Sequence, residues 1–512
     1  MEEIINSKED EIRFYQLKSG GFIDLRAEKV VETLNFLKKF GITRRELEQR
    51  KISVPKSEVF YAADFIGQAA KNKTIDYNGL DLNNIEEKVF NISKKKLSLP
   101  RNLKTELRPY QKEGFRWLKM LYCAGLGGIL ADDMGLGKTV QTIALILSVF
   151  AENPDVKSLI VVPTSLIDNW ISELNRFAPD LKCKAVTGEV EKRRQILKQG
   201  DDYNVLVTSY GLAVNDIKVY RKKMIDILVL DEAQKINNYK TKTAREIKKI
   251  RASNKFGLTG TPIENNLSEL WSIFNWLLPS LLKDFKSFKA RYMSSSDNYQ
   301  ELRKKISPFI LRRMKKNVLH DLPKKTETVI KVDLTDRQKK LYLAYREEAL
   351  QLLKEDKIFN ILTKLTRLRQ ICCHPGMFID DYRELTAKME VLLDSIDELR
   401  TEKRKVLVFS QFTTMLDLIK KELKKNNIEY AALDGRTAQK DRSKIVDDFN
   451  NSNKTALLIS LKAGGTGLNL TSADTVIHCD PWWNPSVEEQ ASARAYRIGQ
   501  ENRVQNSNYQ RR

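Results

Sequence analysis

The chain has 512 residues, more than one hydrophobic core accommodates, so its length predicts roughly two to four domains. Its formal charge of +22, from 89 basic and 67 acidic side chains, favours a polyanionic partner such as nucleic acid, with lysine used for solubility as the alternative. No apolar run approaches the roughly 18 residues of a membrane span, and the start lacks the basic and apolar segments of a signal peptide. Five cysteines without C-x-x-C spacing argue against a disulfide or zinc framework and fit a reducing compartment.

Residues 1–105 carry helical patterns but no chemical motif, and we expect a small helical accessory region there. The next segment, 107–118, places Phe115 and Leu118 at helical spacing, which predicts a helix with a core-facing stripe. This arrangement leaves Gln111 free to meet either a purine edge or solvent.

A strand, a glycine-rich turn and a helix follow one another from residue 127 to residue 147. The turn has the sequence Ala-Asp-Asp-Met-Gly-Leu-Gly-Lys-Thr at 131–139. Gly135 and Gly137 would let backbone N–H groups approach phosphates at the N-terminus of the helix. The segment therefore predicts a phosphate-binding loop.

Two side chains in this loop have a predicted chemical role. Lys138 would reach the β- and γ-phosphates of ATP, and the hydroxyl of Thr139 would bind Mg²⁺. Asp132 occupies the place of the first glycine in the strict G-x-x-x-x-G-K-[ST] pattern, so a glycine turn without nucleotide is the alternative for this motif alone. The nucleotide-binding residues predicted from the loop are Asp132, Met134, Gly135, Leu136, Gly137, Lys138 and Thr139.

Short apolar runs alternate with helical segments from residue 158 to residue 262, as in a parallel sheet. One run ends in Asp231-Glu-Ala-Gln234, which places two carboxylates at the carboxyl end of a buried strand, where α/β sheets bind ligands. Asp231 would hold Mg²⁺, and Glu232 would orient or deprotonate the attacking water. A helix N-cap without chemistry is the alternative for this pair taken alone.

Residues 263–400 break this alternation and predict helices. A second alternating segment begins at Val406 and carries another glycine-rich loop at 462–469. Beyond it, Arg494 and Arg497 lie one helical turn apart, on one face. They are either surface charges or arginine fingers that stabilise transition-state charge.

The motifs of the second segment resemble those of a Swi/Snf-type ATPase, one of the double-stranded-DNA translocases of helicase superfamily two. In chain order they are VLVFSQF at 406–412, SLKAGGTGLNL at 460–470, DPWWNP at 480–485 and RAYRIGQ at 494–500. The first segment adds DDMGLGKT, DEAQ and LTGTP, which the whole superfamily shares. The resemblance covers 106–505 and is closest to prokaryotic members. It implies an α/β fold with two RecA-like lobes on parallel sheets, ATP and Mg²⁺ between the lobes and duplex DNA across both.

The resemblance also implies residue roles. Gln111 would read adenine, and Arg494 and Arg497 would act as arginine fingers from the second lobe. Contacts with the DNA backbone would come from both lobes, through Thr164, Ser165, Ser209, Gln411, Gly435, Arg442, Gly464, Gly465 and Thr466.

Two positions depart from the family pattern. Ala493 stands where an acidic residue usually braces the first arginine finger. After Val504-Gln505 the family adds a last strand and a bracing helix, whereas this sequence ends in Asn-Ser-Asn-Tyr-Gln-Arg-Arg512. We therefore expect a truncated second lobe whose sheet has an uncovered edge.

The expected domains are an accessory region at 1–105, a first lobe at 106–310 with a helical insertion from about 263, and a segment at 311–512. That last segment would hold a helical insertion to about 400 and then the second lobe. The expected function is a DNA-dependent ATPase that translocates along double-stranded DNA and remodels DNA-bound proteins, such as a nucleosome or RNA polymerase, without strand separation. A strand-separating helicase and a nucleotide-gated DNA-binding scaffold with little turnover are the alternatives. We expect a monomeric motor with no membrane partner, in the cytoplasm or nucleoid of a prokaryote or the nucleus of a eukaryote.

Overall fold

The computed structural model describes most of the chain from residue 97 to residue 511 and parts of the N-terminal region. The described N-terminal residues are 14–16, 20–27, 30, 31, 33, 34 and 55–62, and the gaps after residue 97 are 261–265, 295–297, 319–324, 355–357, 462–469, 483–484, 493 and 496–503. The chain forms two compact units. The first comprises 1–131, 140–162 and 174–312, and the second comprises 132–139, 163–173 and 313–512.

The first unit is built on a parallel sheet of seven strands in the order β5-β6-β4-β7-β8-β3-β9. The strands are β3 (Gly128–Leu130), β4 (Ser158–Val162), β5 (Cys183–Ala185), β6 (Val205–Ser209), β7 (Met224–Asp231), β8 (Arg251–Leu258) and β9 (Ile310–Leu311). Every residue of β3, β4 and β6 is buried. A parallel strand covered on both faces needs a continuous apolar run, which is why the sequence predicted these strands.

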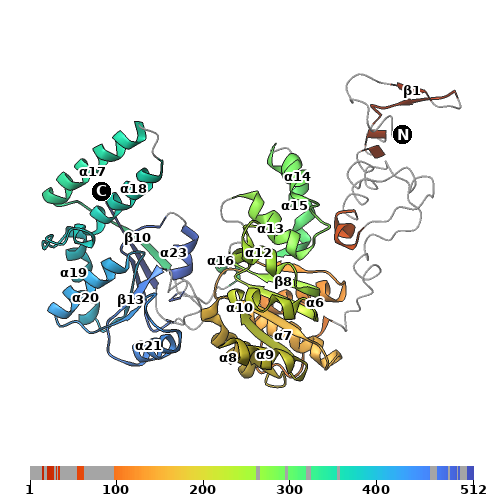
Figure 1. Cartoon of the computed structure of the whole chain (residues 1–512), viewed down its shortest axis with the longest axis horizontal. Coiled ribbons are helices and arrows are strands. Elements are labelled where there is room, and N and C mark those ends of the chain that lie inside the picture. Colours follow the sequence, from red (N-terminus) through yellow and green to blue (C-terminus); the bar gives the residue numbers. More distant parts are fainter. Residues whose placement is uncertain are drawn as a thin grey trace. The chain divides into compact units, whose positions relative to one another are not determined.

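Helices connect the strands of this sheet and extend beyond it. Those that alternate with the strands are α6 (Pro109–Cys123), α7 (Lys138–Glu152), α8 (Ile167–Phe177), α9 (Val190–Lys198), α10 (Tyr210–Asn215), α11 (Ile217–Tyr220) and α12 (Lys242–Ile247). The helices α13 (Leu267–Leu277), α14 (Phe285–Phe288) and α15 (Tyr299–Ile306) then gather together before the chain returns as β9 (Figure 1). This group is the start of the expected helical insertion.

The accessory region was expected to be helical, and its described residues include strands as well as short helical segments. β1 (Phe14–Gln16) and β2 (Phe22–Asp24) pair antiparallel. Residues 55–62 pack against a later part of the first unit, because the Phe60 ring meets the Phe309 ring edge-on at 5.8 Å and Tyr61 is buried. This short segment therefore connects the accessory region to the segment that precedes β9.

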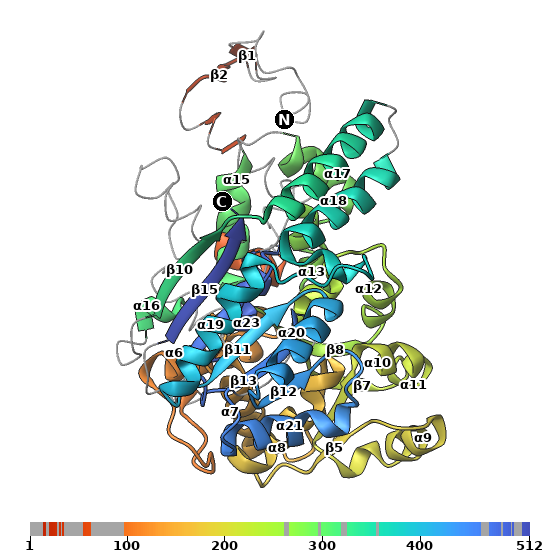
Figure 2. The same cartoon turned by 90° about the vertical axis from the view of Figure 1, so that its left-hand side faces the viewer.

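The second unit is built on a parallel sheet of six strands in the order β10-β15-β14-β11-β13-β12. The strands are β10 (Lys325–Val332), β11 (Val406–Ser410), β12 (Tyr430–Leu433), β13 (Ala456–Ser460), β14 (Thr475–His478) and β15 (Val504–Arg511). The helices are α16 (Lys315–Val318), α17 (Asp336–Lys354), α18 (Ile358–Cys373), α19 (Ala387–Thr401), α20 (Thr413–Lys425), α21 (Gln439–Asn451) and α23 (Pro485–Ser492). α17 and α18 lie side by side in both views (Figures 1 and 2). None of the helices in the described residues combines the length and apolarity that a membrane span requires.

The expectation of a missing last strand and an open sheet edge beside β14 is wrong. Val504–Arg511 forms β15, which pairs with β14 on one side and with β10 on the other. Figure 2 shows β15 beside β10. β10 lies in the segment that was expected to be helical, and side chains 326–329 are exposed. Backbone hydrogen bonds to a neighbouring strand hold β10 and β15 in the sheet, and such bonds do not require apolar side chains. Both strands are rich in polar residues, so neither has the apolar run from which the other strands were predicted.

Candidate functional site

The predicted phosphate loop lies between β3 and α7. Gly135 has φ 83° and Gly137 has φ 77°, a left-handed conformation that glycine adopts without steric cost. α7 begins at Lys138, so Lys138 and Thr139 lie in its first turn, where backbone N–H groups lack partners within the helix. The loop thus has the backbone shape and the helix terminus that bind phosphate.

Hydrogen bonds within the loop hold the lysine. The Nζ of Lys138 donates to the backbone oxygen of Asp132 at 2.7 Å and to that of Asp133 at 3.4 Å. The side chain of Asp132 is fully buried and accepts from the guanidinium of Arg313, whose Nε lies 2.9 Å from Oδ1. Asp132 is therefore part of an ion pair, which local sequence does not predict because the partner lies 181 positions away.

The two predicted carboxylates lie where β7 ends. Asp231 is the last residue of β7, and Glu232 follows with φ 51°, a conformation that costs a residue with a β-carbon of order 1 kcal/mol. The backbone N–H of Glu232 donates to Oδ1 of Asp231 at 2.9 Å. The hydroxyl of Tyr210 donates to the backbone oxygen of Asp231 at 2.8 Å. Burial, followed by the charges of Asp231 and Glu232, raises the pKa of Tyr210 well above its ordinary value, so this phenol stays a donor.

Two further side chains link Glu232 to the next strand. The Nε2 of Gln234 donates to Oε2 of Glu232 at 2.7 Å, and Oε1 of Gln234 accepts from the hydroxyl of Thr259 at 2.8 Å. Thr259 follows β8, so the side chain of Gln234 connects this strand end to the carboxylate of Glu232. Gln234 had no predicted role, although its place in the DEAQ motif was a signal.

The topology of the first sheet brings these segments to one edge. β8 lies between β7 and β3, and all three strands are parallel. The strand ends that carry Asp231, Thr259 and the phosphate loop therefore lie on the carboxyl edge of the sheet, where α/β folds bind their ligands.

Gln111 lies in the first turn of α6 and is 6% exposed. Its Oε1 accepts from the backbone N–H of Arg108 at 2.9 Å, and its Nε2 lies 3.3 Å from the hydroxyl of Tyr110. The glutamine thus caps its own helix, which fixes the position of the amide.

Residues 110–377 match the SNF2-related domain, which is more than half of the chain. The chain belongs to the SNF2-related family. Residues 387–499 of this SNF2-related chain match the helicase conserved C-terminal domain, and residues 1–100 match the bacterial SNF2 helicase-associated domain. The resemblance stated from the sequence motifs is confirmed.

Named relatives of this SNF2-related chain come from bacteria and eukaryotes. An uncharacterized ATP-dependent helicase of Mycoplasma pneumoniae is 39% identical over 489 residues, which cover 94% of this chain and 47% of the relative. The ISWI chromatin-remodeling complex ATPase of Saccharomyces cerevisiae is 34% identical over 434 residues, which cover 79% of this chain and 38% of the relative. The chain thus spans less than half the length of these two relatives.

A solved structure also matches. The SWI2/SNF2 ATPase core of Sulfolobus solfataricus in complex with dsDNA is 36% identical, with 81% of this chain and 90% of that chain covered, at a TM-score of 0.45.

In the second unit, Arg494 is 6% exposed, and its backbone oxygen accepts from the N–H of Leu470 at 3.3 Å. Arg497 and Ala493 lie outside the described residues, as do the predicted DNA contacts Gly464, Gly465 and Thr466. The structure therefore places only one of the two expected arginine fingers.

The remaining predicted DNA contacts, apart from Arg442, lie at or near strand ends. In the first sheet's connections, Thr164 and Ser165 open a short 3₁₀ helix after β4, and Ser209 accepts from the N–H of Leu212 at 3.3 Å as the N-cap of α10. In the second unit, Gln411 follows β11, Gly435 is exposed after β12, and Arg442 lies in α21. Apart from Gly435 itself and its two chain neighbours, no described residue has a heavy atom within 4 Å of the place a β-carbon would take there.

A buried polar group follows β14 in the DPWWNP motif. Asp480 accepts from the backbone N–H of Gln411 at 3.0 Å, and the Nζ of Lys388 donates to the backbone oxygen of Cys479 at 3.0 Å. Burial raises the pKa of Asp480 from 3.8 to about 6, although its hydrogen bonds partly offset this effect. Gln411 is held from the other side by Arg369, whose guanidinium donates to its Oε1 at 3.2 Å. The helical insertion is thus tied to the end of β11.

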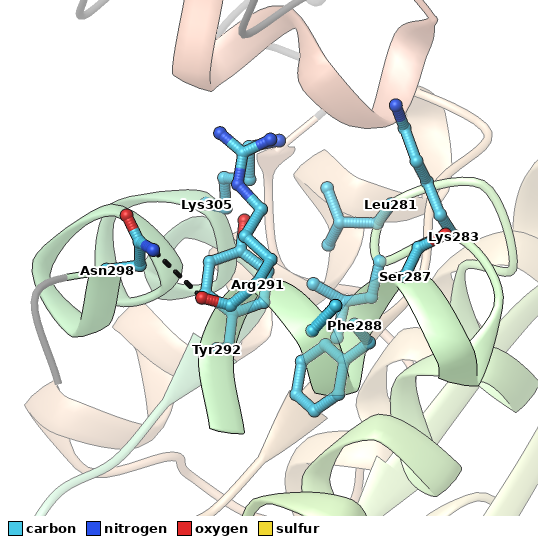
Figure 3. Close-up of a pocket in the computed structure, with 10 residues that line it drawn as sticks. Leu281, Lys283, Ser287, Phe288, Arg291, Tyr292, Asn298 and Lys305 are labelled. Atoms are coloured by element: carbon cyan, nitrogen blue, oxygen red, sulfur yellow. Dashed lines mark hydrogen bonds between the residues drawn. The ribbon is translucent and has the colours of Figure 1, made fainter. Parts of the chain in front are cut away.

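A pocket of about 520 Å³ opens among α14, α15 and the π-helical turn Lys289–Met293 (Figure 3). Phe288 contributes to its apolar lining, and Arg291 and Lys305 contribute charge. Arg291 pairs with Glu301 at 2.9 Å, and the ammonium of Lys305 is buried 3.9 Å from the same carboxylate. Burial lowers the pKa of Lys305. Because its cations face a carboxylate and its lining has no glycine loop, this pocket does not have the features of a phosphate site.

Proposed function

We propose that this SNF2-related protein hydrolyses ATP and uses the energy to move along double-stranded DNA without separating its strands. The observation that supports ATP hydrolysis most directly is the loop between β3 and α7, where two glycines with positive φ precede Lys138 and Thr139. The names of the relatives, an ATP-dependent helicase and a chromatin-remodeling complex ATPase, support the same activity.

The phosphates of ATP bind the loop through its backbone N–H groups and the N-terminus of α7. Lys138 bonds to backbone oxygens 2.7 and 3.4 Å away, which keeps its ammonium inside the loop, where it pairs with the β- and γ-phosphates. Gln111 reads the adenine edge, and its amide is already oriented by its bond to Arg108.

The hydroxyl of Thr139 and the carboxylate of Asp231 would hold Mg²⁺. Hard oxygen ligands of this kind suit the ion, which needs only one or two protein ligands when phosphates complete its shell. When bound there, the ion would supply positive charge to the phosphate oxygens. Glu232 orients and deprotonates the attacking water, and its bond to Gln234 fixes the carboxylate for this task.

Charge in the transition state is also stabilised by Arg494 and Arg497. Arginine fingers of this kind are worth roughly 10³–10⁵ in rate. Arg494 is buried, and its backbone oxygen accepts from the N–H of Leu470 in the second unit, which helps to fix its position.

Movement along DNA is the second part of the proposal. The formal charge of +22 suits a polyanion. Apart from Arg442 in α21, the predicted contacts are hydroxyl, amide and glycine groups at strand ends, which suit phosphate contacts more than base reading. Two lobes that grip in alternation with the nucleotide state advance along the phosphates. The name of the yeast relative supports a DNA-bound protein assembly as the object that is displaced.

The ATPase rate with duplex DNA, with single-stranded DNA and without DNA tests the proposal. We expect duplex DNA to stimulate turnover most, and Lys138→Ala to lose nucleotide binding because the β- and γ-phosphates lose their charged partner. Little turnover both with and without duplex DNA would support the nucleotide-gated scaffold.

A triplex-displacement assay beside a fork-unwinding assay separates translocation from strand separation. We expect triplex displacement without fork unwinding. Fork unwinding without triplex displacement would favour the strand-separating helicase.

A further inference from the structure

Asp132 is a charged side chain in an unexpected place. It is fully buried at the start of the loop that is proposed to bind the phosphates of ATP. A buried carboxylate is costly unless it is paired, and here it would also repel the phosphates nearby. Its partner therefore matters for the nucleotide site.

That partner is Arg313, whose side chain is 10% exposed. Its Nε donates to Oδ1 of Asp132 at 2.9 Å, and its Nη2 donates to Oδ2. This two-pronged geometry matches the planar guanidinium to both carboxylate oxygens, and it is stronger and more directional than a single bond.

Backbone hydrogen bonds surround this ion pair. β9 pairs with β3, and the N–H of Ala131 donates to the oxygen of Leu311 at 2.7 Å just past the end of that pairing. The N–H of Asp133 then donates to the oxygen of Arg313 at 3.0 Å, and the N–H of Lys315 donates to Oδ2 of Asp133 at 2.9 Å. The first residues of the phosphate loop are thus hydrogen-bonded to the segment that follows β9.

The same loop residues position the lysine. The Nζ of Lys138 bonds to the backbone oxygen of Asp132 at 2.7 Å. Asp132 therefore has two contacts: its backbone oxygen accepts from the ammonium of Lys138, and its side chain pairs with Arg313.

We propose that Arg313 is a positioning residue of the nucleotide site. Its ion pair with Asp132 neutralises a buried charge and holds the phosphate loop in the shape that directs Lys138 toward the phosphates. Arg313 acts through Asp132. This inference rests on the proposed ATP site in the same loop.

Arg313→Gln is the first test. It leaves the carboxylate of Asp132 buried without its partner, and we expect the kcat/KM for ATP to fall on the order of 10²-fold because the loop is misplaced. The matched control is Arg312→Gln, which makes the same charge change at the exposed neighbouring residue and should leave the DNA-independent rate unchanged.

A double-mutant cycle with Asp132→Asn distinguishes this role from a general structural one. If the two side chains act as one unit, Asp132→Asn with Arg313→Gln should lose no more activity than the worse single variant. If the double variant instead loses activity by the product of the two single losses, the two side chains act independently and the proposed pairing is wrong. Arg313→Lys is the second variant in case Arg313→Gln fails to fold. It keeps the charge but loses the two-pronged geometry, so we expect a loss of about tenfold in kcat/KM with an unchanged melting temperature.

Titration of a fluorescent ATP analogue separates this inference from the proposed function. If Lys138→Ala binds the analogue as the wild type does, the loop is not the nucleotide site and both statements fail. If Lys138→Ala loses binding but the Arg313 variants match Arg312→Gln, the positioning role alone fails.

Discussion

Replacing Asp480 with asparagine should change how stability depends on pH. The side chain is 2% exposed, and burial raises its pKa to about 6. The folded state therefore holds the proton more tightly than the unfolded state, in which the carboxyl has its ordinary pKa of 3.8. This group destabilises the fold progressively as the pH rises through the interval between the two values, and the effect is complete above about pH 6.

The pKa difference sets the magnitude. Each tenfold change in proton affinity is worth about 1.4 kcal/mol, so the total effect on the free energy of unfolding is about 3 kcal/mol. About 2 kcal/mol of this total should appear between about pH 4 and about pH 7. Asp480→Asn keeps an oxygen that accepts from the N–H of Gln411 but has no proton to lose. The difference in the free energy of unfolding, variant minus wild type, should therefore rise by about 2 kcal/mol between about pH 4 and about pH 7.

The assay is urea unfolding of the wild type and Asp480→Asn over a pH series, with the difference in the free energy of unfolding plotted against pH. Hydrogen exchange of amides in β11 and β14 reports the second unit separately. Asp447→Asn is the matched control because its carboxylate is exposed in the same unit. Parallel curves for the wild type and Asp480→Asn would show that the carboxyl is not desolvated in the folded protein, and would refute the reasoning.

Three further outcomes are expected. Glu232→Gln should bind ATP normally but lower turnover by at least about 10²-fold in a phosphate-release assay, because the water loses its base; near-normal turnover would remove Glu232 from this role. Neutralisation of roughly six to ten phosphates should reduce DNA affinity by about 10³–10⁵ between about 50 and 200 mM salt in a titration, and a flat response would mean that the basic surface does not bind DNA. Arg193→Met should lower the free energy of unfolding by about 3–5 kcal/mol, because it leaves the buried carboxylate of Asp216 without its partner 2.6 Å away. The exposed neighbour Arg194→Met is the control, and an equal effect of the two variants would contradict that cost.

The sequence by itself determined the strands that are buried on both faces and the loops that follow them. β4, β6, β11 and β13 are continuous apolar runs because a parallel sheet covered by helices excludes water along each strand. The glycines of the phosphate loop also predicted its backbone conformation, since a positive φ favours glycine whatever the rest of the fold. Motif order then identified the family.

Only the tertiary structure decided the features that depend on a distant partner. β10 and β15 form through backbone hydrogen bonds to neighbouring strands, and such bonds place no demand on side-chain type. The pairing of Asp132 with Arg313 joins residues 181 positions apart, and the raised pKa of Asp480 comes from burial by the surrounding fold. Local sequence encodes backbone shape and hydrophobic period, whereas the environment of a charge is set by whichever segments the folded chain brings around it.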